Sequence, residues 1–332
     1  MVEPLNFGWN KKGSPPRIMH IGTGLVCGYK ILDMVEAGFD FTILLADWHA
    51  WINNKFGGDM QTIRDCGEYF IEAFSSIGLT KDKVKYVWAS DLVKKDGYWE
   101  TVVRVAKKSN LPRVIRCLPI MGRELKPTDV ETAYLFYPCM QVADIFMLEV
   151  DCACAGMDQR KAHMLARDTA EKLSVKKPVC LHSHLLLGLA GFSEKTEAHY
   201  DENERLSLQI GTKMSKSKPK GCIFIHDSPE DIKSKILGAY CPPRQAEGNP
   251  ILEIVKYVVF AREKSFLIER EAKYGGSVEF SSYEELEKSY VEGKIHPLDL
   301  KNSVVETLTK MLEPVRAYFK GKEKMVERIS RL

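Results

Sequence analysis

The residues best suited to chemistry form a lysine-rich segment in the second half of the chain. Lys213-Met-Ser-Lys-Ser217 offers two ammonium groups and two hydroxyls, and Lys218 and Lys220 follow directly. Lysines on such a loop can close over a triphosphate and stabilise the negative charge that develops on a leaving group. Charge alone leaves a second interpretation open, because most runs of lysine are solvated surface loops.

A second segment with chemical potential is His20-Ile-Gly-Thr23, where a loop is predicted to meet the start of a helix. The N-terminus of a helix favours anions, because its unpaired N–H groups and its dipole point outward. Gly22 would let the backbone approach a bound nucleotide closely. By itself this pattern is weak, since a histidine at a turn is more often a hydrogen-bonded surface residue.

The elements predicted to position these segments alternate between strands and helices. Strands are predicted at residues 41–46, 84–88, 146–153 and 178–182, and helices at residues 25–35, 60–77 and 99–108. Residues 41–46 are apolar on both faces, as in a buried parallel strand, and Asp47 and His49 follow its carboxyl end. This order predicts the α/β class, with a doubly wound, Rossmann-like parallel sheet.

After the last predicted strand, the alternation of strands and helices ends. Residues 191–212 are polar and predict a surface loop. Ser228 followed by Pro229 predicts a helix start, and residues 304–319 predict one amphipathic helix kinked at Pro314. We therefore predict a catalytic domain at 1–222 and a mostly helical C-terminal domain at 223–332.

Composition narrows the class of protein. The 332 residues include 48 Lys plus Arg and 45 Asp plus Glu, for a net charge of +3, which excludes a strongly basic nucleic-acid scaffold. No apolar run is long enough to span a bilayer, and no secretory signal is visible at the start. The nine cysteines are scattered without C-x-x-C spacing, which predicts reduced thiols in a cytoplasmic protein and no metal site.

The two segments together resemble the paired signature of class I aminoacyl-tRNA synthetases. The stretches Tyr137-Pro-Cys-Met-Gln-Val-Ala-Asp144 and Ala155-Gly-Met-Asp-Gln159 are similar to the active-site core of tyrosyl-tRNA synthetases. Residues 44–53 and 295–302 resemble the archaeal and eukaryotic branch of that family, and the resemblance runs from about residue 20 to residue 318.

The resemblance implies an activity, a domain plan and partners. Family members join tyrosine to ATP, forming tyrosyl-adenylate and pyrophosphate, and then pass tyrosine to the terminal ribose of tRNA(Tyr). ATP with Mg²⁺ is implied as a substrate, without a tightly bound organic cofactor. The catalytic domain would contain a connective insertion at about 95–140 and the signature loop at 211–221, and the C-terminal domain would bind the anticodon. A cytoplasmic homodimer joined through residues 99–137 is also implied.

The same resemblance implies roles for individual residues. The catalytic residues would be His20, Lys213 and Lys216. ATP would be bound by His20, Gly22, Thr23, Gly156, Asp158, Met214, Ser215, Lys216 and Ser217. Tyrosine would be bound by Tyr137, Gln141, Asp144, Gln159 and His49, and the anticodon by Tyr274, His296 and Asp299.

Asp144 is the residue expected to read the phenol hydroxyl of the substrate. Its spacing from Tyr137 and Gln141 places all three residues on one face of a helix. A buried carboxylate that accepts this hydrogen bond would be left unpaired by phenylalanine, which provides discrimination. In the C-terminal domain, the rings of Tyr274 and His296 would stack on an unpaired base, and the alternative is that they only cap a helical subdomain.

Three positions depart from the family pattern. Thr23 replaces the second histidine of the first signature, Ala155 replaces a glycine, and Asn6 stands where a tyrosine usually shares recognition of the phenol. These departures leave two alternatives to an active tyrosine–tRNA ligase. One is a catalytically impaired paralogue that acts as a tRNA-binding or scaffold protein. The other is a related adenylate-forming enzyme with a changed amino acid pocket.

Overall fold

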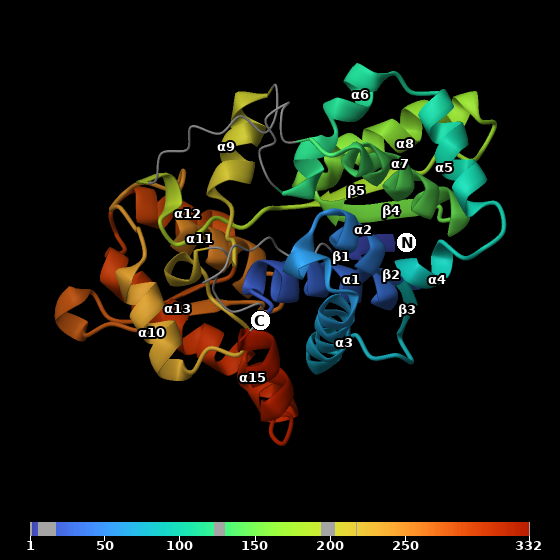
Figure 1. Cartoon of the computed structure of the whole chain (residues 1–332). Helices are drawn as coiled ribbons and strands as arrows, with labels where there is room; N and C mark the ends of the chain where they lie inside the picture. The colour runs from blue at the N-terminus through green and yellow to red at the C-terminus, as the bar shows by residue number, and fades with distance from the viewer. Residues whose placement is uncertain (1, 6–17, 123–129, 194–202, 217, 332) are drawn as a thin grey trace.

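The computed structural model describes residues 2–5, 18–122, 130–193, 203–216 and 218–331 (Figure 1). Its centre is a parallel five-stranded sheet in the order β3-β2-β1-β4-β5. The strands are β1 (Val2–Leu5), β2 (Phe41–Leu45), β3 (Val84–Trp88), β4 (Cys152–Gly156) and β5 (Val179–Ser183). The doubly wound α/β fold predicted from the sequence is therefore confirmed. The sequence did not predict β1, a four-residue strand that contains a proline.

Apolar residues on both faces of the sheet hold helices against it. In β2, Ile43 and Leu45 belong to one cluster of buried side chains and Leu44 to a second. Because successive side chains of a strand point to opposite faces, this strand contributes to two cores. The first core contains residues of α1 (Gly28–Glu36) and α3 (Met60–Ser76). The second contains residues of α5 (Tyr98–Lys107), α7 (Thr132–Met147) and α8 (Arg160–Lys172).

Shorter elements connect this framework in the first part of the chain. They are η1 (Gly22–Cys27), α2 (Asp47–Ile52), η2 (Lys55–Gly58), α4 (Ala89–Leu92), α6 (Leu111–Ile115), η3 (Leu118–Met121), η5 (Met157–Gln159), η6 (Gly191–Ser193), α9 (Glu204–Thr212) and η7 (Pro219–Gly221). The segment η1, which begins two residues after His20, is a short π-helix, a form that is rare and often found at functional sites.

The C-terminal part is mostly helical and also contains an antiparallel pair of strands. Its elements are α10 (Pro229–Gly238), α11 (Pro250–Ile254), η8 (Val255–Val259), β6 (Phe266–Ile268), η9 (Ala272–Tyr274), β7 (Val278–Phe280), α12 (Tyr283–Val291), α13 (Pro297–Met311), α14 (Glu313–Tyr318) and α15 (Glu323–Arg331). As predicted, Ser228 caps α10, since its hydroxyl accepts a hydrogen bond from the N–H of Asp231.

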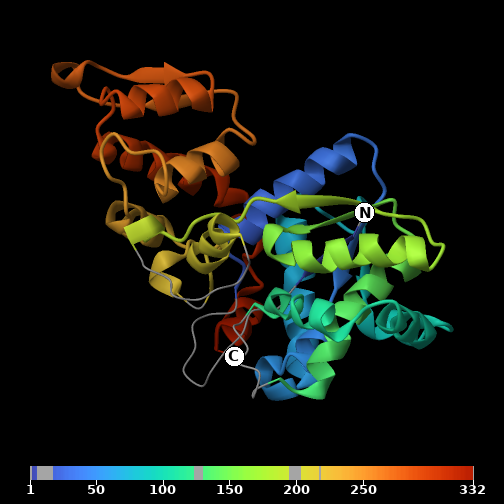
Figure 2. The ribbon, with the colours of Figure 1, turned by 90° about the horizontal axis from the view of Figure 1, so that it is seen from above.

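The C-terminal helix α15 packs against α3, beside the five-stranded sheet (Figure 2). Arg328 of α15 pairs with Asp65 of α3 at 2.6 Å. The hydroxyl of Tyr318 donates to Glu72 of α3 at 3.0 Å. The first core contains buried residues of the sheet and of the C-terminal helices.

Three predicted element boundaries were wrong. The strand predicted at 146–153 begins only at Cys152, because the helical hydrogen bonds of α7 continue to Leu148, whose N–H donates to the Asp144 carbonyl. The last nine residues of the loop predicted at 191–212 form helix α9, which is capped by Asn203. The helix predicted at 304–319 is two helices, since Pro314 lies in the first turn of α14 and begins a new helix. Among the described residues, no helix is both long and apolar enough to cross a membrane.

Candidate active site

The strand order places the candidate site at the carboxyl edge of the sheet. The order reverses beside β1, and in open parallel sheets ligands bind in the crevice at such a switch point. His49 lies on α2, which follows β2, and Asp158 and Gln159 lie on η5, which follows β4. Predicted site residues therefore follow the two strands that flank β1.

Asp144 lies at the centre of a buried polar cluster. Its side chain is inaccessible to solvent, and its Oδ1 accepts a hydrogen bond from the Tyr98 hydroxyl at 2.8 Å. Its Oδ2 lies 3.2 Å from Nε2 of His49. Burial, and then the charge of Asp144, raise the pKa of the Tyr98 phenol, so Tyr98 remains a protonated donor. The cluster holds the Asp144 carboxylate in one orientation.

The other predicted tyrosine-binding residues line the same region. The Tyr137 ring meets the His49 ring edge to face, with centroids 4.9 Å apart. Gln141 donates through Nε2 to Oε1 of Gln159 at 3.3 Å, and Gln159 donates to the Ile120 carbonyl at 3.0 Å. Residues from α2, α7 and η5 are thereby joined in one network.

Two oxygens in this network are buried acceptors without a hydrogen bond from any described residue. They are Oδ2 of Asp144 and Oε1 of Gln141. Buried polar atoms are nearly always hydrogen-bonded in native proteins, so this pair of acceptors suits a ligand that donates to both. The two residues are three positions apart on α7 and share a face of the helix. This arrangement suits a molecule that carries two donors, such as a hydroxyl and an ammonium group.

The lysine-rich loop is anchored beside this site at both ends. Lys213 pairs with Leu187 in a short antiparallel bridge, and the N–H of Met214 donates to the Leu186 carbonyl at 2.6 Å. At the other end, the N–H of Leu189 donates to the Gly221 carbonyl at 3.0 Å. The segment between these anchors contains Ser217, which lies outside the described residues.

The two lysines of the signature converge on the residues of the first signature and of η5. Nζ of Lys213 forms an ion pair with Oδ2 of Asp158. Nζ of Lys216 lies 4.5 Å from the centre of the Phe70 ring. Burial, and then the charges of Lys216 and Lys213, lower the pKa of His20 to about 3. His20 is therefore neutral near pH 7, as suits a hydrogen-bond partner of a phosphate or hydroxyl group.

Two glycines lie close to Asp158 and His20, the residues that the two lysines approach. A Cβ at Gly156 would lie 2.7 Å from Oδ1 of Asp158, and one at Gly22 would lie 3.0 Å from Nδ1 of His20. Thr23 is close to the same histidine, with its Oγ1 3.4 Å from Nε2. Both glycines therefore leave room for functional side chains to keep their positions.

The three predicted anticodon residues lie on two segments of the C-terminal part. Tyr274 is 62% exposed at the end of η9, and His296 caps α13, accepting from the N–H of Leu298 at 3.2 Å. Asp299 lies in the first turn of α13. Arg270 joins the two segments, because its guanidinium donates to the Gly276 carbonyl at 2.7 Å and the Lys294 carbonyl at 2.8 Å.

Sequence reasoning missed Tyr98 and Arg270. Tyr98 lies on an amphipathic helix, where an aromatic residue is indistinguishable from an ordinary core residue. Arg270 donates to backbone carbonyl groups, which every residue has, so the sequence does not indicate these contacts. Asn6, the departure that bears on the phenol, lies outside the described residues.

Comparisons with known proteins identify the family. The family model described as class I tRNA synthetases (W and Y) matches residues 14–313. The chain belongs to this family. The tyrosine–tRNA ligase of Saccharolobus solfataricus is 48% identical over 320 residues, which cover 96% of this chain and 87% of that protein. The tyrosine–tRNA ligase of Aeropyrum pernix is 48% identical over 308 residues, covering 92% and 84%.

Solved structures of this synthetase family agree with the comparisons of sequence. The tyrosyl-tRNA synthetase of Pyrococcus horikoshii, crystallised with L-tyrosine, superimposes with a TM-score of 0.88 at 40% identity, covering 100% of this chain and 90% of that one. A tryptophanyl-tRNA synthetase from Aeropyrum pernix has a TM-score of 0.69 at 16% identity, covering 99% and 80%, and shares the fold. The family predicted from the two signatures is confirmed.

Proposed function

We propose that this chain is a tyrosine–tRNA ligase whose active site combines the two subsites described above. The observation that carries the proposal is the pair of unsatisfied acceptors on α7, which is joined through Gln159 to the neighbouring Asp158. Tyrosine supplies the two donors that these acceptors lack. The related ligases, at 48% identity, support the same substrate.

In the amino acid subsite, the phenol hydroxyl of tyrosine donates to Oδ2 of Asp144. The ammonium group donates to Oε1 of Gln141, and the ring of Tyr137 lies against the same pocket. Tyr98 occupies the other oxygen of Asp144, so a single acceptor remains for the substrate. Phenylalanine would leave that acceptor buried and unpaired, which costs about 1–3 kcal/mol or more for a charged group.

In the nucleotide subsite, the carboxylate of tyrosine attacks the α-phosphorus of ATP. A bond forms from the carboxylate oxygen to phosphorus, and the bond from phosphorus to the bridging oxygen of pyrophosphate breaks. Asp158 accepts hydrogen bonds from the ribose hydroxyls, which requires Lys213 to leave it. Lys213 and Lys216 then stabilise the charge of the departing pyrophosphate, and neutral His20 hydrogen-bonds to ATP.

Mg²⁺ enters this scheme as part of the ATP substrate. Among the described residues, no three acidic, histidine or cysteine side chains gather to hold a metal ion. Magnesium usually keeps several waters and binds through substrate phosphates, which agrees with the basic character of this subsite.

Transfer of tyrosine requires a tRNA that reaches both parts of the chain. A hydroxyl of its terminal ribose attacks the carbonyl carbon of the adenylate and releases AMP. Tyr274 and His296 would stack on an anticodon base, and Asp299 would hydrogen-bond to its edge. The exposed position of Tyr274 and the Arg270 contacts support this role for the C-terminal part. A cytoplasmic location is part of the proposal.

A homodimer formed through the connective insertion is also part of the proposal. Leu111 and Ile115 of α6 are 56% and 46% exposed, and large apolar residues on a surface often mark an interface. Sedimentation of the Ile115→Lys variant tests this, because the charge would dissociate a dimer built on α6. A variant that sediments as the parent protein does would contradict the interface.

The function is tested by exchange of labelled pyrophosphate into ATP, with each amino acid supplied in turn. We expect exchange with tyrosine and far slower exchange with phenylalanine. Exchange with a different amino acid would indicate an altered pocket. A protein that catalyses no exchange but binds tRNA would be an impaired paralogue.

A further inference from the structure

Residues 184–189, which we name the anchor segment, connect β5 to η6 and belong to no helix and to no strand of the five-stranded sheet. They hold the lysine-rich loop at both of its ends. The N–H of Gly188 donates to the Thr212 carbonyl at 2.9 Å, and the bonds at Met214 and Leu189 described above complete the contact. The position of the loop therefore depends on what holds the anchor segment.

Glu253 of α11, in the C-terminal part, holds the anchor segment through one carboxylate oxygen. Its Oε2 accepts a hydrogen bond from the N–H of Leu187 at 2.9 Å and lies 3.0 Å from Nε2 of His184. Because an ionised carboxylate only accepts hydrogen bonds, Nε2 of His184 carries a proton and donates it. The His184 ring also stacks on the ring of Tyr257, with centroids 3.9 Å apart. Two side chains of the C-terminal part thus fix the anchor segment.

The peptide group between Leu186 and Leu187 joins Glu253 to the loop directly. Its N–H donates to Glu253, and its carbonyl accepts from the N–H of Met214 at 2.6 Å. Hydrogen bonds to an ionised group are about twice as strong as those between neutral groups, and bonds in a chain polarise one another. The charge of Glu253 therefore strengthens the bond to Met214, the residue that follows Lys213.

Burial favours this chain of bonds. Leu186, Leu187 and Leu189 are buried, and the side chains of Glu253 and His184 are each 22% exposed. Water competes little for hydrogen bonds in such surroundings. Without the carboxylate, the buried N–H of Leu187 would lose its partner, which is costly for a buried donor.

We propose that Glu253 is a positioning residue for the lysine-rich loop. It fixes the 186–187 peptide group and so sets the place of residues 212–214. Lys213 can then leave Asp158 and reach the departing pyrophosphate while the base of its loop stays in place. The inference rests on the proposed function, since it assumes that Lys213 acts on pyrophosphate. Glu253 touches neither tyrosine nor ATP in this scheme, and its effect reaches the reaction through the loop.

The Glu253→Ala variant tests this role. We expect kcat for tyrosine-dependent pyrophosphate exchange to fall about 10- to 100-fold, because small misplacements of a catalytic group are costly. KM for tyrosine should stay unchanged, because the amino acid subsite is built on α2, α7 and η5 and the loop acts in the transition state. Glu253→Gln should recover part of the loss, since its amide oxygen can still accept from Leu187.

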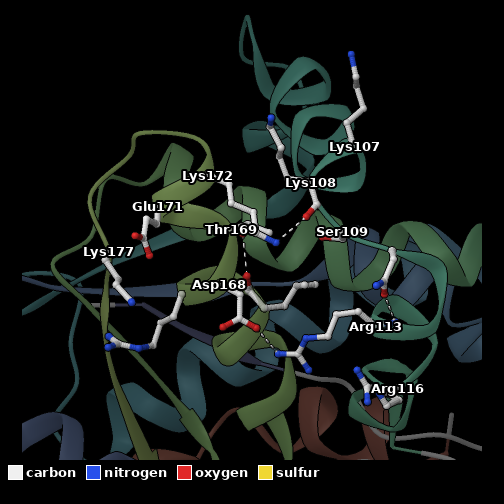
Figure 3. A pocket seen from close by; sticks show the side chains of 13 residues that line it. Lys107, Lys108, Ser109, Arg113, Arg116, Asp168, Thr169, Glu171, Lys172 and Lys177 are labelled. Atoms are coloured by element: carbon white, nitrogen blue, oxygen red, sulfur yellow. Dashed lines mark hydrogen bonds and ion pairs between the residues drawn. The ribbon is translucent and has the colours of Figure 1, made fainter.

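Two carboxylates that join other elements serve as matched controls. Asp33 of α1 pairs with Arg262 of the C-terminal part at 2.6 Å. Asp168 of α8 pairs with Arg113 of α6 at 2.8 Å, at a cavity on the catalytic part (Figure 3). Because partly exposed ion pairs contribute little, Asp33→Ala and Asp168→Ala should keep kcat within about twofold of the parent protein.

A double-mutant cycle with Lys213 separates positioning from a general loss of stability. If Glu253 acts through the loop, its replacement should cost less in the Lys213→Ala background than in the parent protein. An equal cost in both backgrounds would overturn the proposal. It would also be overturned by an unchanged kcat in Glu253→Ala, or by a higher KM for tyrosine without a lower kcat. Glu253→Gln provides the same comparisons should the alanine variant fold poorly.

Amide hydrogen exchange tests the hold on the loop without relying on activity. We expect the N–H of Met214 to exchange about tenfold faster in Glu253→Ala than in the parent protein, and at the parent rate in both controls. If the parent protein catalyses no pyrophosphate exchange, the proposed function fails, and the Met214 rate still decides whether Glu253 fixes the loop. Equal Met214 rates in the parent protein and in Glu253→Ala would overturn the proposal.

Discussion

Replacing Asp144 by asparagine keeps the shape of the side chain and removes its charge. In the structure one carboxylate oxygen is taken by the Tyr98 hydroxyl at 2.8 Å, and the other faces His49. Asparagine has a single acceptor oxygen, which Tyr98 would occupy. The phenol of tyrosine would then face an amide group in place of a carboxylate.

The loss can be estimated from this geometry. A hydrogen bond to a charged group contributes about 1.5–3 kcal/mol, which corresponds to a loss of roughly 10- to 150-fold in kcat/KM for tyrosine. Phenylalanine should lose nothing and gain slightly, because a neutral amide costs less to leave unpaired than a carboxylate does. The ratio of the two kcat/KM values should therefore fall at least about tenfold.

Pyrophosphate exchange with each amino acid measures this ratio. Asp91→Asn is a suitable control, since its side chain is exposed and lies on the surface beside Lys94. Denaturant unfolding of both variants separates a folding defect from a change in specificity. If Asp144→Asn kept the ratio of the parent protein, the carboxylate would not be the reader of the phenol.

Three further outcomes follow from the structure. Lys213→Ala should slow pyrophosphate exchange about 10²- to 10³-fold. The same variant should bind adenosine more tightly, because Asp158 loses its ion-pair partner. Unchanged inhibition by adenosine would contradict this. Arg270→Ala should raise KM for tRNA about tenfold without affecting pyrophosphate exchange, and Arg270→Lys should recover part of the loss. If the rise in KM persisted for a tRNA with a changed anticodon base, Arg270 would not position the anticodon residues. His20 takes up a proton below pH 6.5 in the unfolded chain but stays neutral in the folded protein down to about pH 3. The free energy of unfolding should therefore fall by about 1–2 kcal/mol from pH 7 to pH 5. The fall should be smaller in the His20→Gln variant. Equal pH dependence in both proteins would exclude this contribution.

Periodicity and motif spacing predicted much of the fold. The strands predicted at residues 41–46 and 84–88 are present as β2 and β3. The apolar run of β2 fits a buried parallel strand, whereas β3 lies at the edge of the sheet and exposes Lys85. The pattern failed where an apolar run suits two structures. Phe146 and Met147 are apolar in a helix and in a strand alike, and only the continued hydrogen bonds of α7 decide between them.

The candidate site was predictable where residues share one element. Tyr137, Gln141 and Asp144 follow helical spacing, so their common face could be derived from the sequence. Contacts between residues of different elements could not be derived from the sequence. Tyr98 reaches Asp144 across 46 positions, and Arg270 reaches Lys294 across 24, and such distances depend on how the helices pack.

A crystal structure with a non-hydrolysable tyrosyl-adenylate analogue tests the central claim most directly. We expect the phenol oxygen within hydrogen-bond distance of Oδ2 of Asp144, the ammonium group at Gln141, and the ribose hydroxyls at Asp158 with Lys213 displaced. A ligand bound elsewhere, or an intact Lys213–Asp158 ion pair beside the bound analogue, would contradict the account of a single cavity that joins tyrosine to adenosine monophosphate.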